Sequence, residues 1–99
     1  MKITSTLENN TLTLAVEGRL DTTTSPELEQ TINDRIADVT SLIFDFSNLE
    51  YISSSGLRVL LKAQKKINTV GEMKVLHPNE LVTEVFEVTG FCDILTIEK

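Results

Sequence analysis

Tryptophan, a second cysteine and long apolar runs are all absent from this sequence. With no tryptophan and aromatic residues at 5% of the chain, a surface that stacks nucleic-acid bases is not expected. Cys92 stands alone, so no internal disulfide can form, and we expect a largely buried thiol in a reducing compartment. The N-terminus lacks an apolar signal-peptide core, and no run approaches the roughly 20 apolar residues that span a bilayer. We therefore expect a cytoplasmic protein without membrane insertion.

Positive charge is also scarce. Nine lysine and arginine residues face fifteen aspartate and glutamate residues, which gives a formal net charge of −6. Because no basic stripe offsets this negative field, direct binding of nucleic acid is not predicted. The acidity favours solubility and would suit a basic patch on a protein partner.

Motifs that hold cofactors are missing as well. The chain contains neither G-x-G-x-x-G nor G-x-x-x-x-G-K-[ST], the sequences that cradle nucleotide phosphates. Histidine and cysteine occur once each and the carboxylates are scattered, so no metal site is predicted. We expect neither a cofactor nor a metal.

Hydrophobic periodicity predicts one α/β domain in the 99 residues. After a hairpin that turns at Asn9-Asn10, strands alternate with helices, which predicts a mainly parallel sheet in the order strand-strand-helix-strand-helix-strand-helix-strand. The apolar stripe of the first helix extends over 28–39, and the nearly continuous apolar run 42–46 indicates a strand covered on both faces. The expected strands are 2–7, 11–17, 42–46, 73–76 and 94–97, and the expected helices begin near residues 24, 54 and 79.

Polar residues and glycines mark the ends of the expected helices. Thr24 with Glu27 fits a capping box, and Ser25 before a proline is an equally good start for the first helix. Gly71 is placed to end the second helix in the left-handed conformation, and Gly90 is placed to end the third.

Three serines and a glycine, Ser53 to Gly56, lie at the start of the second helix. The first amides of a helix have no partner within it, and the helix dipole favours negative charge there. A serine at this point is either a cap, worth about 1 kcal/mol, or a place for a phosphate. The glycine costs about 1 kcal/mol of helix propensity relative to alanine and would let another molecule approach the backbone. Loop 21–24 also leaves the carboxyl end of a strand, so we expect the two loops side by side at the end of the sheet where function gathers.

A hydrolase is the main enzymatic alternative. Ser55, His77 and Asp21 have the residue types of a catalytic triad. A nucleophile elbow, however, needs glycine two residues before the serine, and Ser53 occupies that position. We therefore predict that the protein is not an enzyme.

Two charged residues near the serines each allow two interpretations. Asp21 is either a turn residue whose carboxylate accepts N–H bonds from its own loop, or a surface carboxylate beside the serines. Arg58 lies in the first turn of the second helix, where a cation opposes the dipole. Arg58 is therefore either simply exposed, which is the default, or paired with an anion such as Asp21, Glu50 or a phosphate of a partner.

The run Asp45–Leu57 resembles the signature of bacterial anti-sigma factor antagonists, which belong to the STAS domains. The loop Gly18–Asp21 is similar to the second motif of that family, and His77–Phe91 resembles its closing helix. The resemblance covers essentially the whole chain, so it implies one STAS domain over residues 1–99. It also implies a mixed sheet with helices packed on one side.

The resemblance further implies a phosphorylation switch. In that family the unmodified protein binds an anti-sigma factor that is also a serine kinase, which frees the sigma factor. The kinase then phosphorylates the serine before the glycine, here Ser55, and a serine phosphatase reverses the step. Where the family often has aspartate this chain has Ser53, so Ser53 and Ser54 stay open as acceptors. The residues expected to contact the partner are Asp21, Thr22, Ser53, Ser54, Gly56, Leu57 and Arg58. The alternative is an adaptor of the same fold without phosphorylation, such as a subunit of a membrane lipid transporter.

Overall fold

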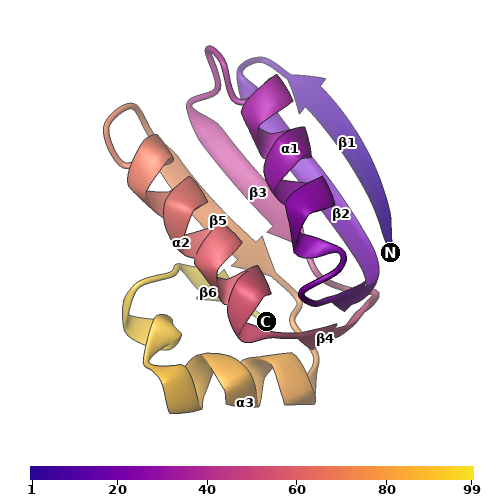
Figure 1. Cartoon of the computed structure of the whole chain (residues 1–99). Helices are drawn as coiled ribbons and strands as arrows, with labels where there is room; N and C mark the ends of the chain where they lie inside the picture. The colour runs from indigo at the N-terminus through magenta and orange to yellow at the C-terminus, as the bar shows by residue number, and fades with distance from the viewer.

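The computed structural model describes all 99 residues as a mixed β-sheet with two helices lying on one of its faces and a third at its end (Figure 1). The predicted fold class, a single α/β domain with a mainly parallel sheet, is confirmed. The elements in chain order are β1 (Lys2–Glu8), β2 (Thr11–Leu20), α1 (Ser25–Arg35), β3 (Ser41–Asp45), β4 (Leu49–Ile52), α2 (Ser54–Ile67), β5 (Glu72–Leu76), α3 (Glu80–Thr89), the short 3-10 helix η1 (Phe91–Asp93) and β6 (Ile97–Glu98).

The strands follow the spatial order β1-β2-β3-β5-β6, and β4 pairs with the far end of β2. Only β1 and β2 are antiparallel, and every other pairing is parallel. The hairpin turns at Asn9 and Asn10, whose φ values of 48° and 67° lie in the left-handed region that asparagine tolerates. This turn confirms the prediction made from the Asn-Asn pair.

The strand β4 was not predicted, and it adds one element to the expected order. It is four residues long and pairs with β2 only after a register shift between Gly18 and Arg19. Gly18 has φ +94°, a conformation open to glycine, and its amide donates to the Asn48 carbonyl oxygen at 3.0 Å. The bulge therefore bends β2 toward a partner that local periodicity does not identify.

The sheet buries one face only. Leu42, Phe44 and Phe46 are fully buried beneath the helices, whereas Ile43 and Asp45 are half-buried on the opposite face. The prediction that this strand is covered on both faces was wrong, because an alternating pattern with isoleucine on its open side looks continuous in sequence. The prediction of helices on one side is confirmed (Figure 1).

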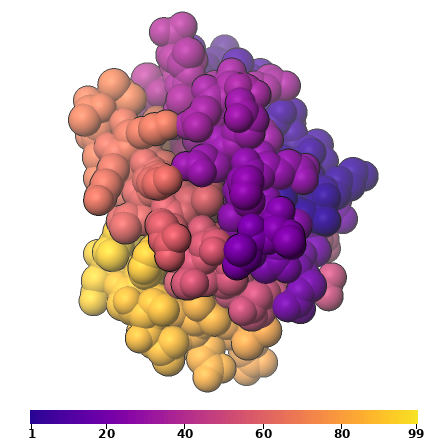
Figure 2. Space-filling view, viewed as in Figure 1, coloured from indigo at the N-terminus to yellow at the C-terminus, as the bar shows by residue number.

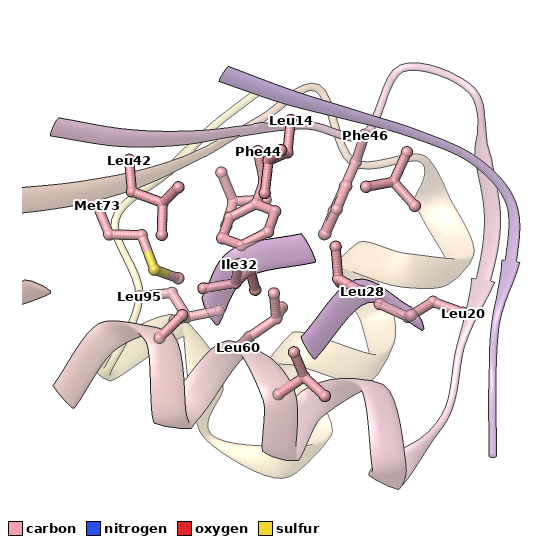
Figure 3. Close-up of a cluster of buried hydrophobic side chains, with 14 of the residues drawn as sticks. Leu14, Leu20, Leu28, Ile32, Leu42, Phe44, Phe46, Leu60, Met73 and Leu95 are labelled. Atoms are coloured by element: carbon pink, nitrogen blue, oxygen red, sulfur yellow. The ribbon is translucent and has the colours of Figure 1, made fainter. Parts of the chain in front are cut away.

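The core lies between the sheet and the pair α1 and α2. In Figure 3, Leu14 and Phe44 of the sheet point toward Ile32 of α1 and Leu60 of α2. The space-filling view shows α1 and α2 packed against each other on this face, with the C-terminal segment from α3 onwards below them (Figure 2). No helix of this chain has both the length and the apolar content needed to cross a bilayer.

The start of α1 differs from the predicted capping box. Thr24 is the N-cap residue, but its side chain makes no cap hydrogen bond. Its hydroxyl instead donates to the Arg19 carbonyl oxygen at 2.8 Å and accepts from the Asp21 amide at 2.8 Å. The helix also ends at Arg35 rather than near Val39, which remains 2% exposed after a turn through Asp38 at φ +64°.

Two further predictions near the C-terminal half were wrong. Gly71 does not adopt a left-handed conformation, since only Gly18 and Gly90 among the glycines have positive φ. Cys92 is exposed rather than buried, because it lies in η1 after the Gly90 cap turns the chain. The left-handed cap at Gly90, with φ +79°, is confirmed.

Candidate functional site

Two loops that leave the carboxyl ends of β2 and β4 meet at one end of the sheet. The Ser53 amide donates to the Leu20 carbonyl oxygen at 2.9 Å, and the hydroxyl oxygens of Thr22 and Ser55 lie 3.3 Å apart. The parallel pairing of β2 with β4 causes this arrangement, because it brings the residues after both strands together. The predicted juxtaposition of loops 21–24 and 53–56 is confirmed.

The cap of α2 is provided by Ser53. Its backbone is extended, with φ −99° and ψ 176°, and its side-chain oxygen accepts from the Gly56 amide at 3.4 Å. Ser54 is exposed and Ser55 is half-buried, and neither side chain is used in the cap. The Ser55 hydroxyl is therefore available at the surface beside Thr22.

Gly56 is required by internal packing rather than by the approach of another molecule. It is buried, and a Cβ at this position would lie 2.8 Å from Ile52 Cγ1 and 2.8 Å from Leu20 Cγ. Real Cβ atoms do not approach side chains so closely, and both neighbours belong to the core. The glycine thus lets α2 begin directly over the ends of β2 and β4.

Leu57 also lies in the interior, with 5% of its surface exposed. Its predicted role as a partner contact is corrected to packing beneath the loop, because a side chain in the core cannot meet a docking protein. The exposed or half-buried members of the predicted set are Asp21, Thr22, Ser53, Ser54 and Arg58.

Asp21 organises its own loop, as the turn interpretation predicted. Its Oδ1 accepts from the Thr23 hydroxyl at 2.7 Å and from the amides of Thr23 and Thr24 at 3.1 and 3.2 Å. The Thr23 hydroxyl, followed by these amides, holds the pKa of Asp21 below its ordinary value of 3.8. Oδ2, the other carboxylate oxygen of Asp21, lies 3.9 Å from Arg19 Nε. The Asp21 carboxylate is partly exposed at the surface, one residue before Thr22.

We expect acid to destabilise the protein partly through Asp21. Because its folded pKa is lowered, its contribution to stability is complete above the unfolded value near 3.8 and is lost as the pH falls through the folded pKa. Denaturant unfolding between about pH 7 and about pH 3 should show a smaller loss of stability for Asp21→Asn than for the native protein.

Asp45→Asn is a parallel test of the same effect and should likewise lose less stability with acid than the native protein. The Ser47 hydroxyl and amide lower the pKa of Asp45 in the same way, but Asp45 lies on the open face of the sheet. An Asp21→Asn protein that loses stability with acid as steeply as the native protein would contradict the assignment.

A shallow groove of about 160 Å³ lies between the N-terminal halves of α1 and α2, and we call it the α1–α2 groove. Ser55 lies at the end of the groove next to the loop that carries Thr22. Within it, Lys62 Nζ lies 3.0 Å from Glu29 Oε2 and joins the two helices. Its lining consists of Thr22, Ser25, Pro26, Glu29, Ser55, Arg58, Val59 and Lys62.

Arg58 is exposed in the groove and forms no ion pair. Of the two interpretations, the exposed arginine is confirmed and a pair with Asp21 or Glu50 is not formed, because Asp21 lies beside Arg19 instead. The Arg19 guanidinium also lies 4.4 Å from the ring centroid of Tyr51, which holds it away from the groove. Arg58 is therefore a cation of the site that no carboxylate neutralises.

The residues of the considered hydrolase triad do not form one. The Ser55 hydroxyl lies beside the Thr22 hydroxyl, and the Asp21 carboxylate accepts hydrogen bonds from its own loop. His77 directly follows β5, outside the two loops that carry Asp21 and Ser55. No group of three or more histidine, cysteine, aspartate or glutamate side chains is arranged to hold a metal ion.

The groove contains residues that the sequence analysis did not assign to the site. Lys62 could have been found, because Ser55, Arg58 and Lys62 recur at i, i+3 and i+7 on one face of a helix. Ser25 and Glu29 come from a different helix, and no local pattern relates them to the serines. Their place depends on how α1 packs against α2.

A small α/β domain that presents hydroxyl-bearing loops beside an unpaired arginine has the character of a regulatory binding module. The chain belongs to the STAS domain family, whose model matches residues 2–99. The anti-sigma factor antagonists of this family are non-enzymatic regulators, in agreement with the prediction that the protein is not an enzyme.

Individual relatives support the same placement. The chain is 30% identical over 99 residues to BtrV of Bordetella bronchiseptica, covering 98% of this chain and 85% of that protein. It is 28% identical over 101 residues to the anti-sigma-B factor antagonist of Staphylococcus aureus, covering 100% of this chain and 94% of that protein. SpoIIAA of Bacillus shares the fold in its unphosphorylated form (TM-score 0.78, 20% identity, covering 99% of this chain and 87% of that one) and in its phosphorylated form (TM-score 0.77, 22% identity, covering 99% and 92%).

Proposed function

We propose that this protein is an anti-sigma factor antagonist controlled by phosphorylation of Ser55. In the unmodified state it binds an anti-sigma factor that is also a serine kinase, and this binding frees the sigma factor. Phosphorylation of Ser55 blocks the contact, and a serine phosphatase restores it. We further propose that the exchange takes place in the cytoplasm, where the kinase finds its ATP.

The observation that carries this proposal is the placement of the Ser55 hydroxyl. It is half-buried, is not used in the cap of α2 and lies 3.3 Å from the Thr22 hydroxyl of the neighbouring loop. A docking protein that covers both loops must therefore cover this oxygen. The side chains that we expect it to meet are Asp21, Thr22, Ser53, Ser54 and Arg58, while Gly56 and Leu57 shape the loop from inside.

The proposed modification changes charge and bulk without changing the fold. The Ser55 oxygen forms a bond to the γ-phosphorus of ATP, the bond from that phosphorus to the β–γ bridging oxygen breaks, ADP leaves, and the hydroxyl proton passes to a base of the kinase. The product carries a charge of about −1.5 to −2 at the start of α2, where the helix dipole favours an anion. The unphosphorylated and the phosphorylated form of SpoIIAA both have this fold, and we expect the same of the two forms of this chain.

Ser55 is favoured over its neighbours as the acceptor. The Ser53 oxygen already accepts from the Gly56 amide, so modifying it would remove the cap of α2. Ser54 is exposed but does not line the α1–α2 groove, whereas Ser55 does. Ser55 also directly precedes the glycine, which is the acceptor position in the family that the chain resembles.

Incubation with the cognate anti-sigma kinase and ATP should phosphorylate Ser55 alone. Phosphosite mapping by mass spectrometry checks this result, with Ser55→Ala as the variant that should abolish incorporation and Ser54→Ala as the matched variant that should retain it. An unmodified Ser55 with a kinase that is active on another substrate would overturn the switch. Purification with a lipid-transporter ATPase in place of a kinase would favour the adaptor function instead.

A further inference from the structure

We propose that the α1–α2 groove receives the phosphoryl group of phosphorylated Ser55 and that Arg58 is its pairing cation. This inference rests on the proposed phosphorylation of Ser55 and adds the group that holds the phosphate within the same molecule. The candidate is a guanidinium that lies in the groove without a carboxylate partner.

The geometry places the two groups together. Ser55 and Arg58 are three residues apart on α2, so their side chains leave the same face of the helix about one turn apart. Both line the α1–α2 groove, together with Thr22 of the loop before α1 and Ser25 of α1, whose hydroxyl already donates to the Asp21 carbonyl oxygen. A phosphoryl group on the Ser55 oxygen therefore extends into a groove that has the Thr22 hydroxyl on one side and a guanidinium on the other.

The charges around the groove single out Arg58 among the nearby cations. Lys62 is engaged with Glu29 at 3.0 Å, and Arg19 lies beside Asp21 and over Tyr51. The two carboxylates near the groove are thus already opposed by cations. Arg58 remains free, and its planar guanidinium can donate two parallel N–H bonds to phosphate oxygens.

The same position explains why an unpaired arginine is present at an unfavourable place. Arg58 lies in the first turns of α2, where a cation opposes the helix dipole and gains nothing in the unmodified protein. Once Ser55 carries a dianion, the same cation is attracted to it. Arg58 should therefore be neutral or slightly destabilising before phosphorylation and stabilising afterwards.

This reversal of sign provides the test. Phosphoserine is installed at position 55 by genetic encoding, so that no kinase is needed, and urea unfolding is measured with and without Arg58→Gln. In the phosphorylated protein, Arg58→Gln should raise the unfolding equilibrium constant about fivefold to tenfold. In the unmodified protein the same substitution should leave that constant unchanged or lower it by up to about twofold.

A second readout follows the phosphate itself. By phosphorus NMR, Arg58→Gln should raise the second pKa of the phosphoserine, because the nearby guanidinium favours the dianion. Three other charged residues also act on this phosphate, namely Asp21, Glu29 and Lys62. They are unchanged between the phosphorylated protein and its Arg58→Gln variant, so they do not contribute to the difference in pKa. Arg58→Lys should recover part of both effects, since it keeps the charge but loses the bidentate geometry.

Lys65→Gln is the matched control, because Lys65 is an exposed cation of the same helix that does not line the groove. Equal effects of Arg58→Gln and Lys65→Gln, or equal effects of Arg58→Gln in the two forms, would overturn the pairing. A phosphorylated protein that still bound the anti-sigma factor fully would refute the proposed function while leaving the pairing with Arg58 intact.

Discussion

Phosphorylation of Ser55 is expected to lower the affinity for the anti-sigma factor by about a thousandfold. The hydroxyl is half-buried between two loops that a docking protein would cover. A phosphate there adds a charge of about −1.5 to −2, and closing the interface would strip water from it. Even with Arg58 beside it, this phosphate must lose water and be accommodated in the closed interface, which costs roughly 4 kcal/mol and corresponds to that loss of affinity.

Calorimetric titration of the anti-sigma factor with the unmodified and phosphorylated forms measures this effect. Ser55→Ala should bind within about threefold of the native protein, because it removes one hydroxyl and adds no charge. Lys65→Asp places a negative charge on an exposed residue of the same helix, outside both the groove and the expected contact set, and should cost less than about tenfold. Equal affinities for the two forms would refute control by blocking.

Gly71→Ala is expected to destabilise the protein by about 3 kcal/mol and to lower its melting temperature by roughly 15 °C. A Cβ at Gly71 would lie 2.5 Å from the Thr40 carbonyl carbon and closer still to its oxygen. The Thr40 backbone cannot yield easily, because its oxygen accepts from the Glu72 amide at 3.0 Å and its amide donates to the Asn10 carbonyl oxygen at 2.9 Å. The clash is therefore with backbone that other strands hold in place.

Gly90→Ala is the matched control for this prediction. Gly90 has φ +79° and open space where a Cβ would stand, so alanine there costs only the strain of a left-handed conformation, about 1 kcal/mol. Thermal and urea unfolding should give a clearly lower melting temperature and free energy of unfolding for Gly71→Ala than for Gly90→Ala. The reverse order would show that the close approach at Thr40 relaxes without cost.

The two glycines also illustrate the reach of sequence reasoning. Gly90 follows an apolar helical stripe and was correctly predicted to end it, because a left-handed cap is a local device. Gly71 occupies a similar place after α2 but has no left-handed backbone. Its lack of a side chain serves a contact with Thr40, which is 31 residues earlier in the chain. No pattern around residue 71 indicates that contact.

In the candidate site, too, some features were predictable from local sequence and others depend on tertiary packing. A serine of the run 53–55 was considered as a possible cap of α2, and loop 21–24 was predicted to lie beside the serines. Gly56 was predicted to let another molecule approach the backbone. The side chains of Leu20 and Ile52, which leave no room for a Cβ at Gly56, are brought there only by the tertiary structure. Arg58 was recognised as misplaced with respect to the helix dipole, but the absence of an ion partner follows from the position of Arg19.

The sequence alone determined the sheet and helices, the hairpin at Asn9-Asn10, the end of α3, the family and the neighbourhood of the serine loop. These features depend on periodicity, turn chemistry and capping, which act over a few residues. The tertiary structure decided the strand β4, the open face beyond Ile43, the exposure of Cys92 and the α1–α2 groove. Each of these depends on which distant segments pack together, and contacts of that kind have no local signature in the chain.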